Sequence, residues 1–373
     1  MEPFYPLHVY VCDNCLLVQL EEYESAAHIF GDYLYFSSYS QLWLQHCREY
    51  ARQMAERYRL SASSLVVEVA SNDGYLLQYF KERGVGVLGV EPAANVAKIA
   101  IDKGIPTDVA FFGADTARRL VDAGKQADLT AANNVLAHVP DLNDFVAGFK
   151  ILLKPTGVAT FEFPHLLQLI RECQFDTIYH EHFSYFSLLV VDRIFAHHGL
   201  TVFDVEELPT HGGSLRVFAT HAEAAPQRSR GFDAVSAAER AAGLDQPPSY
   251  ADFGTAVTEV KCRLLEFLIG LLREGKSVAG YGAPAKGNTL LNYCGIGPEL
   301  IPYTVDLSPH KQGRYLPGVQ IPIYAPQRIF ETRPDYVLIL PWNLKDEISM
   351  QMAAIRDWGG RFAVAIPTLT ILD

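Results

Sequence analysis

Residues 65–92 read LVVEVASNDGYLLQYFKERGVGVLGVEP, and the prediction of the fold starts from this stretch. Leu65–Val69 is an apolar run with one acid, as in a buried parallel strand. The next five residues, ASNDG, are small or turn-forming, which suits a backbone that bends close to a ligand. Tyr75–Arg83 has helical spacing, and Val85–Val90 is a second strand that runs into Glu91. The stretch therefore predicts a nucleoside-binding βαβ unit, with the final acid accepting from ribose hydroxyls.

The turn after the first strand lacks the GxGxxG order of a dinucleotide site. Glu68 within the strand and the Asn72-Asp73-Gly74 turn instead resemble the S-adenosylmethionine (SAM) loop of class I methyltransferases. The alternative is an ordinary turn in a doubly wound sheet. The residues expected to contact this donor lie at the ends of three strands and in the first turn: Glu68, Ala70, Asn72, Gly74, Tyr75, Leu76, Glu91, Pro92, Asn133 and Asn134.

Length and composition describe a folded α/β protein. The chain has 373 residues, of which 49% are hydrophobic and 20% charged, enough for two or three domains. A net charge of −12 argues against a general nucleic-acid surface. No apolar run reaches the ~18 residues of a membrane span, and six cysteines are too few for a disulfide scaffold. We expect a cytoplasmic monomer that binds neither nucleic acid nor membrane.

Three regions are expected along the chain. Residues 1–60 form a small N-terminal part resembling the remnant of a zinc ribbon, followed by a helix, and residues 61–220 form the class I methyltransferase Rossmann-like domain. Residues 221–373 hold a linker, a long helix and a second Rossmann-like domain. The glycine-rich turn Gly282–Asn288 in that last region could bind phosphate on its backbone N–H groups, assisted by Lys286. The alternative is a structural turn without a ligand.

The N-terminal part contains one CxxC motif. Two thiolates, Cys12 and Cys15, could bind one side of a tetrahedral zinc, but a structural site needs four ligands. His46 and Cys47 are the only nearby candidates, and they lie in the predicted helix Gln41–Tyr58. Two incidental cysteines on a hairpin are the alternative. Between hairpin and helix, the tyrosine- and serine-rich run DYLYFSSYS (residues 32–40) suits either simple packing or a segment that covers a ligand.

A polar run that follows the fifth strand of the predicted domain carries candidate catalytic residues. The order Tyr179-His180-Glu181-His182 is not the HExxH of a metalloprotease. On a helical turn, Tyr179 and His182 would share a face. If the methyl acceptor is carbon beside a ketone, an imidazole would serve as base and a phenol would support the enolate oxygen. His138, after the fourth strand, is a second imidazole near the same place. A satisfied, partly buried polar cluster is the alternative.

Eight motifs occur in an order that resembles a known family. They are CDNCLLVQL, YLYFSSYS, VEVASNDGYLL, GVEPAANVA, ANNVLAHVPDL, FDTIYHEHFSYFS, HGGSLR and GYGAPAKGN. Together they resemble the SAM-dependent C-methyltransferases of deoxysugar biosynthesis, including those that methylate C3 of a dTDP-linked 4-keto sugar. The resemblance covers essentially the whole chain, and it implies a zinc-binding N-terminal part, a SAM domain and a C-terminal Rossmann-like domain with the nucleotide sugar between them.

The resemblance also assigns roles to residues. It implies that His182 removes the C3 proton and that Tyr179 supports the enolate, with Glu181, His138 and Tyr33 at further active-site positions. Contacts to the nucleotide-linked sugar are expected from Tyr35, His180, Tyr185, Lys286 and Asn288. The family has an earlier CxxC, upstream of the first residue here, so Cys12 and Cys15 are expected to form an incomplete zinc site.

The sequence therefore predicts a SAM-dependent C-methyltransferase acting on a nucleotide-linked keto-deoxysugar. An O- or N-methyltransferase of another natural product would use the same donor loop with less need of Tyr179 and His182. A non-catalytic nucleotide-binding protein would keep the glycine-rich turns and show no turnover.

Overall fold

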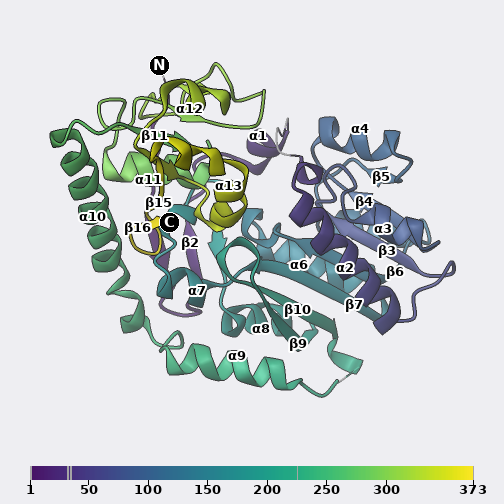
Figure 1. Ribbon diagram of the computed structural model, residues 1–373. Helices are drawn as coiled ribbons and strands as arrows, with labels where there is room; N and C mark the ends of the chain where they lie inside the picture. Colours follow the sequence, from purple (N-terminus) through teal and green to yellow (C-terminus); the bar gives the residue numbers. More distant parts are fainter. Residues whose placement is uncertain (1, 32, 34–35, 225, 373) are drawn as a thin grey trace. The chain divides into compact units, whose positions relative to one another are not determined.

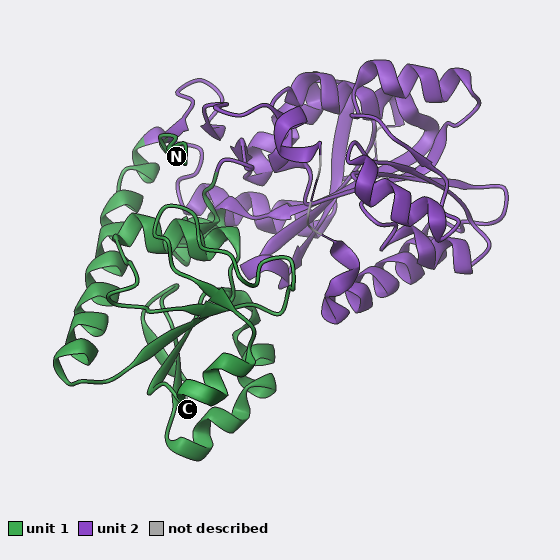
Figure 2. Cartoon of the chain, turned by 90° about the horizontal axis from the view of Figure 1, so that it is seen from above, with its two compact units in different colours: residues 1–8, 167–179, 248–373 green, residues 9–166, 180–247 purple. Residues whose placement is uncertain are grey.

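The computed structural model describes residues 2–31, 33, 36–224 and 226–372 (Figure 1). The chain divides into two compact units (Figure 2). Unit 1 comprises residues 1–8, 167–179 and 248–373, and unit 2 comprises residues 9–166 and 180–247. The three regions expected from the sequence remain a prediction.

Unit 2 is built on a seven-stranded sheet of order β5-β4-β3-β6-β7-β10-β9. The first five of these strands are parallel, whereas β10 is antiparallel to both β7 and β9. This is the arrangement of the predicted class I Rossmann-like domain. The bounds are β3 (Leu65–Val69), β4 (Gly86–Val90), β5 (Thr107–Asp108), β6 (Ala127–Asn133), β7 (Leu153–Pro164), β9 (Leu200–Leu208) and β10 (Ser214–His221).

Helices cover both faces of this sheet because successive strand residues point to opposite sides. Val158 of β7 packs in the cluster that contains α2 and α3, whereas its neighbours Ala159 and Phe161 pack in the cluster that contains α6 and α8. Figure 1 shows these helices beside the sheet. The bounds are α1 (Ala26–Phe30), α2 (Gln41–Arg57), α3 (Leu77–Glu82), α4 (Ala94–Asp102), α5 (Ala114–Asp122), α6 (Leu142–Leu152), α8 (Leu188–His197) and α9 (Arg230–Ala241).

Helix α9 lies where the sequence suggested a linker, and that interpretation was wrong. Ser229 caps the helix by accepting a hydrogen bond from the Phe232 N–H at 3.1 Å. Phe232, Val235 and Glu239 are buried at spacings of three and four residues, which is the pattern of a helix with one buried face. The proline-rich flanks hid this periodicity.

A small sheet of order β1-β2-β8 attaches the polar run to unit 2. Its strands are β1 (Val9–Val11), β2 (Val18–Leu20) and β8 (Ser184–Tyr185). The Phe183 N–H donates to the Ala137 carbonyl at 2.7 Å, and the Phe183 carbonyl accepts from the Leu20 N–H at 2.9 Å. The helical turn expected at residues 179–182 was wrong: these residues form a non-helical turn, and the backbone of Phe183, directly after them, bonds to neighbouring segments.

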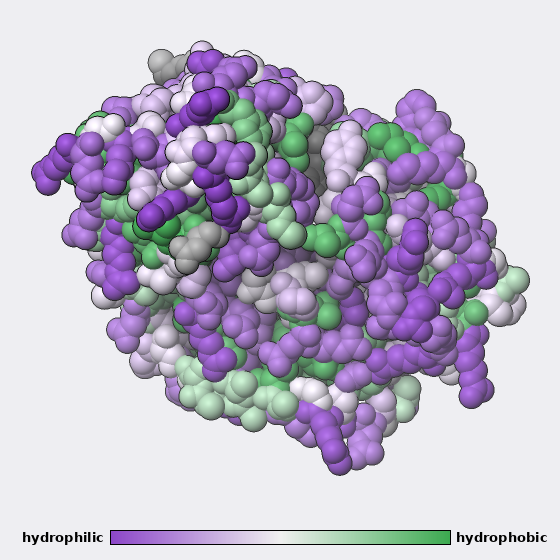
Figure 3. All heavy atoms as spheres, in the orientation of Figure 1, coloured by the Kyte–Doolittle hydropathy of each residue, from purple (hydrophilic) through white to green (hydrophobic). Residues whose placement is uncertain are grey.

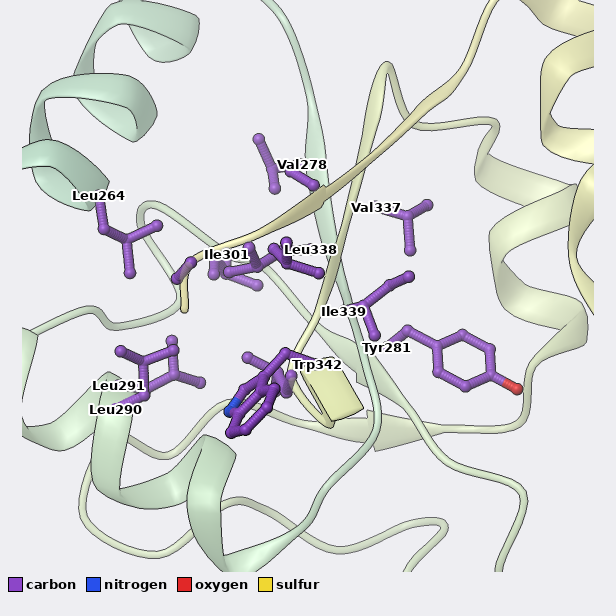
Figure 4. Packing of buried hydrophobic residues seen from close by; sticks show 14 of the residues in the cluster. Leu264, Val278, Tyr281, Leu290, Leu291, Ile301, Val337, Leu338, Ile339 and Trp342 are labelled. Carbon is purple, nitrogen blue, oxygen red and sulfur yellow. The ribbon is translucent and has the colours of Figure 1, made fainter. Parts of the chain in front are cut away.

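Unit 1 has a six-stranded sheet of order β13-β12-β11-β14-β15-β16, parallel except for β16. Figure 4 shows its core, where Val278 and Leu338 of the strands lie with Leu290 and Leu291 of α11. The bounds are β11 (Val278–Tyr281), β12 (Thr304–Val305), β13 (Ile323–Tyr324), β14 (Tyr336–Ile339), β15 (Arg361–Val364), β16 (Thr370–Leu372), α7 (Leu166–Arg171), α10 (Phe253–Arg273), α11 (Ala285–Cys294), α12 (Gln327–Thr332) and α13 (Lys345–Gln351).

Hydrophilic residues dominate the face shown in Figure 3, and hydrophobic ones occur in small scattered groups. Within the part of the chain that the structure describes, no helix combines the length and apolarity needed to cross a bilayer.

One buried acid joins α8 to α9. Glu239 is fully buried, and its carboxylate accepts from the backbone N–H groups of Leu188 at 2.6 Å and Leu189 at 2.9 Å, at the start of α8. The His165 Nε2 lies 2.7 Å from the same carboxylate. Glu239 therefore satisfies helix-end donors that would otherwise be buried without partners.

We predict that Glu239→Ala lowers the free energy of unfolding by about 3 kcal/mol or more, because it leaves buried donors unpaired. Urea unfolding followed by circular dichroism measures this. Asp233→Ala, an exposed acid on the same helix, is the control and should cost about 0.3–1 kcal/mol. Equal losses from the two variants would contradict the assigned role.

Candidate functional site

The turn after β3 has a strained backbone. Ala70 and Asn72 have φ values of 57° and 48°, and Gly74 has a φ of 78°. A Cβ on Gly74 would lie 2.4 Å from the Ile105 Cδ1, so glycine is required there. Strained residues persist where the surroundings hold them, and they gather at functional sites. The turn thus has the features expected of a ligand-binding loop.

Glu91, directly after β4, organises this turn. One carboxylate oxygen accepts from the Asn72 N–H at 2.9 Å and the other from the Ala93 N–H at 2.9 Å. Burial raises the pKa of Glu91, and the two backbone donors oppose that shift. Each oxygen keeps a second lone pair that could accept from a ribose hydroxyl. In the chain, Pro92 lies between Glu91 and α4.

Glu68 provides the strongest sign of an absent ligand. It is fully buried, and neither carboxylate oxygen has a hydrogen-bond partner among the described residues. Burial raises its pKa well above the ordinary value, and the Tyr75 phenol opposes this. A buried acid without partners is costly unless a donor-rich ligand satisfies it. The ammonium of SAM is such a group, so the residues present fit this donor. Leu76, also expected at the donor, is fully buried in the core.

Two asparagines at the end of β6 face the same edge of the sheet. Asn134 has a φ of 53°, and its N–H donates to the Glu162 carbonyl at 2.7 Å. Its side-chain nitrogen lies 3.3 Å from the His211 Nε2. The side-chain oxygens of Asn133 and Asn134 are buried without a partner in the described part of the chain. Both amides therefore retain capacity for a ligand.

The serine- and tyrosine-rich segment is hydrogen-bonded to the donor turn. The Ser37 N–H donates to the Asn72 side chain at 3.0 Å, and the Ser38 hydroxyl donates to the Asp73 carboxylate. The Tyr33 backbone exchanges hydrogen bonds of 3.3 and 2.8 Å with the Asn95 side chain on α4. These contacts support the interpretation of a segment that covers the turn. Tyr35 lies outside the described residues.

An aromatic group beside the turn was missed by sequence reasoning. The Trp43 ring on α2 lies 5.0 Å from His46, 6.0 Å from Tyr75 and 5.5 Å from His211. The His46 Nε2 contacts the Glu162 carboxylate at 2.9 Å. The HGGSLR motif begins at His211, but a single sequence gave no partner for it.

The imidazole of His138 connects the polar run to the main sheet of unit 2. His138 ends the 3-10 helix η2 (Leu136–His138), which follows β6. Its Nδ1 lies 2.9 Å from the Glu181 carbonyl, and because a carbonyl only accepts, this nitrogen donates. Burial lowers the pKa of His138 to about 4. The ring is therefore neutral near pH 7, with Nε2 unprotonated.

Other predicted residues gather around His138. The His182 ring lies 4.8 Å from His138 and 6.0 Å from Tyr185, and Phe30 of α1 lies 5.3 Å from His138. Burial raises the pKa of the Glu181 carboxyl, while a hydrogen bond with the Tyr33 side chain lowers it. The structure thus joins His138, Glu181, His182, Tyr33 and Tyr185 in one group.

The other two members of the YHEH motif are described by different features of the structure. The His180 ring lies 6.1 Å from Tyr23 and so faces the N-terminal part of unit 2. Tyr179 is the last residue of the 167–179 segment of unit 1.

Unit 1 contains the predicted glycine-rich turn. Gly282 turns the chain with a φ of 93°, and helix α11 begins at Ala285, within the residues expected to form the turn. The Lys286 ammonium donates to the Asn343 side chain at 2.9 Å, and burial lowers its pKa. The Asn288 side chain accepts from Asn292 at 3.2 Å. An ammonium at the start of a ten-residue helix suits an anion.

The CxxC motif lies on the β1–β2 hairpin. Cys12 and Cys15 have free thiols, and the backbone N–H groups of Cys15 and Asn14 lower the pKa of the Cys12 thiol. This arrangement fits one half of a zinc site. Among residues 2–31, 33, 36–224 and 226–372, no group of three or more histidines, cysteines or acids could hold a metal. His46 and Cys47 are not its partners, since His46 contacts Glu162 and Cys47 is buried in the core.

Three family models match the chain. A methyltransferase domain matches residues 42–205, a C-methyltransferase C-terminal domain matches residues 209–367, and a candidate zinc-binding domain matches residues 1–30. The last match covers the CxxC hairpin.

The chain is similar to curated relatives and to solved structures. The C-methyltransferase NovU of Streptomyces niveus is 39% identical over 372 residues, covering 100% of this chain and 89% of NovU. A ubiquinone biosynthesis O-methyltransferase of Methylobacterium nodulans is 28% identical over 116 residues, covering 30% of this chain and 45% of that protein. The PH0226 protein from Pyrococcus horikoshii OT3 aligns with 53% of this chain and 99% of its own at 15% identity, with a TM-score of 0.42.

The full-length identity to NovU and the two domain models agree with the strained turn, the unsatisfied Glu68 and the sheet order. The chain belongs to the SAM-dependent C-methyltransferases.

Proposed function

We propose that this enzyme methylates the carbon next to the ketone of a nucleotide-linked deoxysugar, at C3 of a dTDP-linked 4-keto sugar, and acts as a cytoplasmic monomer. The observation that carries the proposal is the group of His138, Glu181 and His182 beside the edge of the sheet that bears the donor turn. A C–H bond beside a ketone is a weak acid, so it needs a base and support for the enolate. Methylation of oxygen or nitrogen has less need of such a base and of support for an enolate.

His182 is the proposed base, because its neighbour His138 is neutral and adds no positive charge that would suppress proton uptake. His182 takes the C3 proton, and the electron pair of that C–H bond moves to the C4 ketone oxygen. Tyr179 would donate to that oxygen, and Glu181 would be a further member of the active-site group. Tyr33 positions Glu181. Bound SAM would supply an electrophilic methyl group: as C3 bonds to it, the methyl–sulfur bond would break and S-adenosylhomocysteine would leave.

The proposed donor site consists of the strained turn and the strand ends of unit 2. Glu91 would accept from the ribose, Glu68 from the ammonium, and Asn133 from donors of the adenosine part. The segment hydrogen-bonded to Asn72 would exclude water from the reacting groups.

The proposed nucleotide site lies in unit 1. Lys286, the free N–H groups at the start of α11 and the Asn288 amide suit the diphosphate of a nucleotide sugar. Asp306, after β12, shapes this turn by accepting from the N–H groups of Ala283 and Ser308, both at 2.8 Å.

We predict that Glu91→Ala weakens SAM binding about tenfold or more, since charge-assisted hydrogen bonds contribute about 1.5–3 kcal/mol each. Isothermal titration calorimetry measures the affinity, and circular dichroism checks the fold. Glu91→Gln keeps one acceptor oxygen and should lose less. Glu82→Ala, an exposed acid on α3, is the matched control. Unchanged affinity in a folded Glu91→Ala protein would remove this residue from the donor site.

The proposed chemistry predicts that proton abstraction runs without methyl transfer. Wild-type enzyme with a dTDP-4-keto sugar and S-adenosylhomocysteine in heavy water should introduce deuterium at C3, which NMR and mass spectrometry detect. His182→Asn should slow this exchange and turnover by about 10²–10⁴-fold. Tyr179→Phe should cost about 10–10³-fold if other donors share the enolate oxygen.

The exposed His197→Asn serves as the control for these variants. Exchange at the wild-type rate in His182→Asn would show that another residue is the base, and His138 would be tested next. Transfer of the methyl group to oxygen or nitrogen would contradict the proposed function itself.

A further inference from the structure

A buried acid lies unexpectedly close to the proposed anion site of unit 1. Asp176 is fully buried in the 3-10 helix η3 (Phe175–Thr177), three residues before Tyr179. One carboxylate oxygen accepts from the Trp342 Nε1 at 2.8 Å, and the other has no hydrogen-bond partner in the described part of the chain. Burial raises the pKa of Asp176 to about 6, against the opposing effects of Lys286 and Trp342. A carboxylate beside the proposed anion site repels an anionic ligand, so its presence there needs a physical explanation.

Trp342 contacts both Asp176 and Lys286. The Lys286 Nζ lies 4.6 Å from the centre of the indole ring whose N–H binds Asp176. Donation of the indole N–H to a carboxylate polarises the ring and strengthens its attraction for a cation on its face. Burial lowers the pKa of Lys286, and the charge of Asp176 opposes that effect. Asp176 therefore favours a charged, fixed Lys286.

The same segment rests on the helix that starts at the anion turn. The Thr289 hydroxyl donates to the Ile178 carbonyl at 3.2 Å, and the Phe175 ring lies 5.2 Å from Tyr293. Both partners, Thr289 and Tyr293, belong to α11. The peptide that leads into Tyr179 and the turn that carries Lys286 are thus held by one set of contacts.

We propose that Asp176 is a positioning residue that, through Trp342, keeps Lys286 charged and in place for the substrate diphosphate and fixes the peptide leading into Tyr179. This role rests on the proposed function of the turn. In this role Asp176 affects both the binding of the diphosphate at Lys286 and the placement of the catalytic motif. The nucleotide part of the substrate therefore contributes to kcat as well as to KM.

Calorimetry of inorganic pyrophosphate binding to the full chain tests whether Asp176 strengthens or weakens the binding of an anion. Removing a negative charge near an anion should tighten binding if only direct repulsion acts. The proposal requires the opposite: Asp176→Asn should weaken binding about tenfold, because Lys286 loses its support. Trp342→Phe, which removes the indole N–H, should act in the same direction. Asp357→Asn, an exposed acid of the same unit, should change nothing.

A double-mutant cycle separates this proposal from the proposed function. Lys286→Met should weaken pyrophosphate binding at least as much as Asp176→Asn does, to an affinity that calorimetry still measures at high pyrophosphate concentration, and adding Asp176→Asn should then cause no further loss. Wild-type binding by Lys286→Met would overturn the anion site itself. Tighter or unchanged binding by Asp176→Asn beside a binding-deficient Lys286→Met would overturn only the role of Asp176. If Asp176→Asn does not fold, Trp342→Phe carries the same test.

Steady-state kinetics with the nucleotide-linked sugar provide the second readout. Asp176→Asn should lower kcat and raise KM, whereas a purely structural loss would lower the active fraction and leave KM unchanged. A changed kcat with wild-type KM and wild-type pyrophosphate affinity would contradict the proposal.

Discussion

The hydrogen bond from the His138 Nδ1 to the Glu181 carbonyl, 2.9 Å long, is the contact on which the proposed catalytic group depends. It ties the polar run to the segment that follows β6, next to the backbone hydrogen bond from Phe183 to Ala137. With the backbone fixed at both points, the side chains of Glu181 and His182 have little freedom to leave the edge of the sheet. Because burial keeps His138 neutral, the contact brings no charge into the group. A protonated ring would make proton abstraction by His182 harder.

The donor turn is likewise held by residues that link it to other segments. Glu91 binds the Asn72 backbone, and the Asn72 side chain binds the Ser37 backbone, so one residue links the turn to its covering segment. The strain at Ala70 and Asn72 is maintained by this framework. Both carboxylate oxygens of Glu68, on β3, and one of Asp73, in the turn, have no hydrogen-bond partner among the residues described. Order in the turn therefore comes from the protein, and in the proposed function its remaining polar groups bind SAM.

Most of the main sheet of unit 2 could be predicted because its strands carry a local signal. The apolar run Leu65–Val69 has the same bounds in sequence and structure. Helix α9 was missed because the proline-rich segments on either side of it indicated a linker, despite the helical spacing of its three buried positions. The turn at residues 179–182 was misjudged because the next residue, Phe183, is hydrogen-bonded to Leu20 and Ala137, which a local pattern cannot show. Asp176, Trp43 and His211 escaped notice for the same reason, since their partners are distant in sequence.

The central claim is that a neutral His138, protonated at Nδ1, holds the catalytic run in place, and nitrogen-15 NMR of histidine-labelled enzyme tests it directly. The His138 signals can be assigned by their loss in His138→Gln. The structure predicts a neutral ring with the Nδ1–H tautomer from pH 8 to about 5, protonating only near its lowered pKa of about 4. Protonation of His138 near pH 6.5, or an Nε2–H tautomer at neutral pH, would contradict the account.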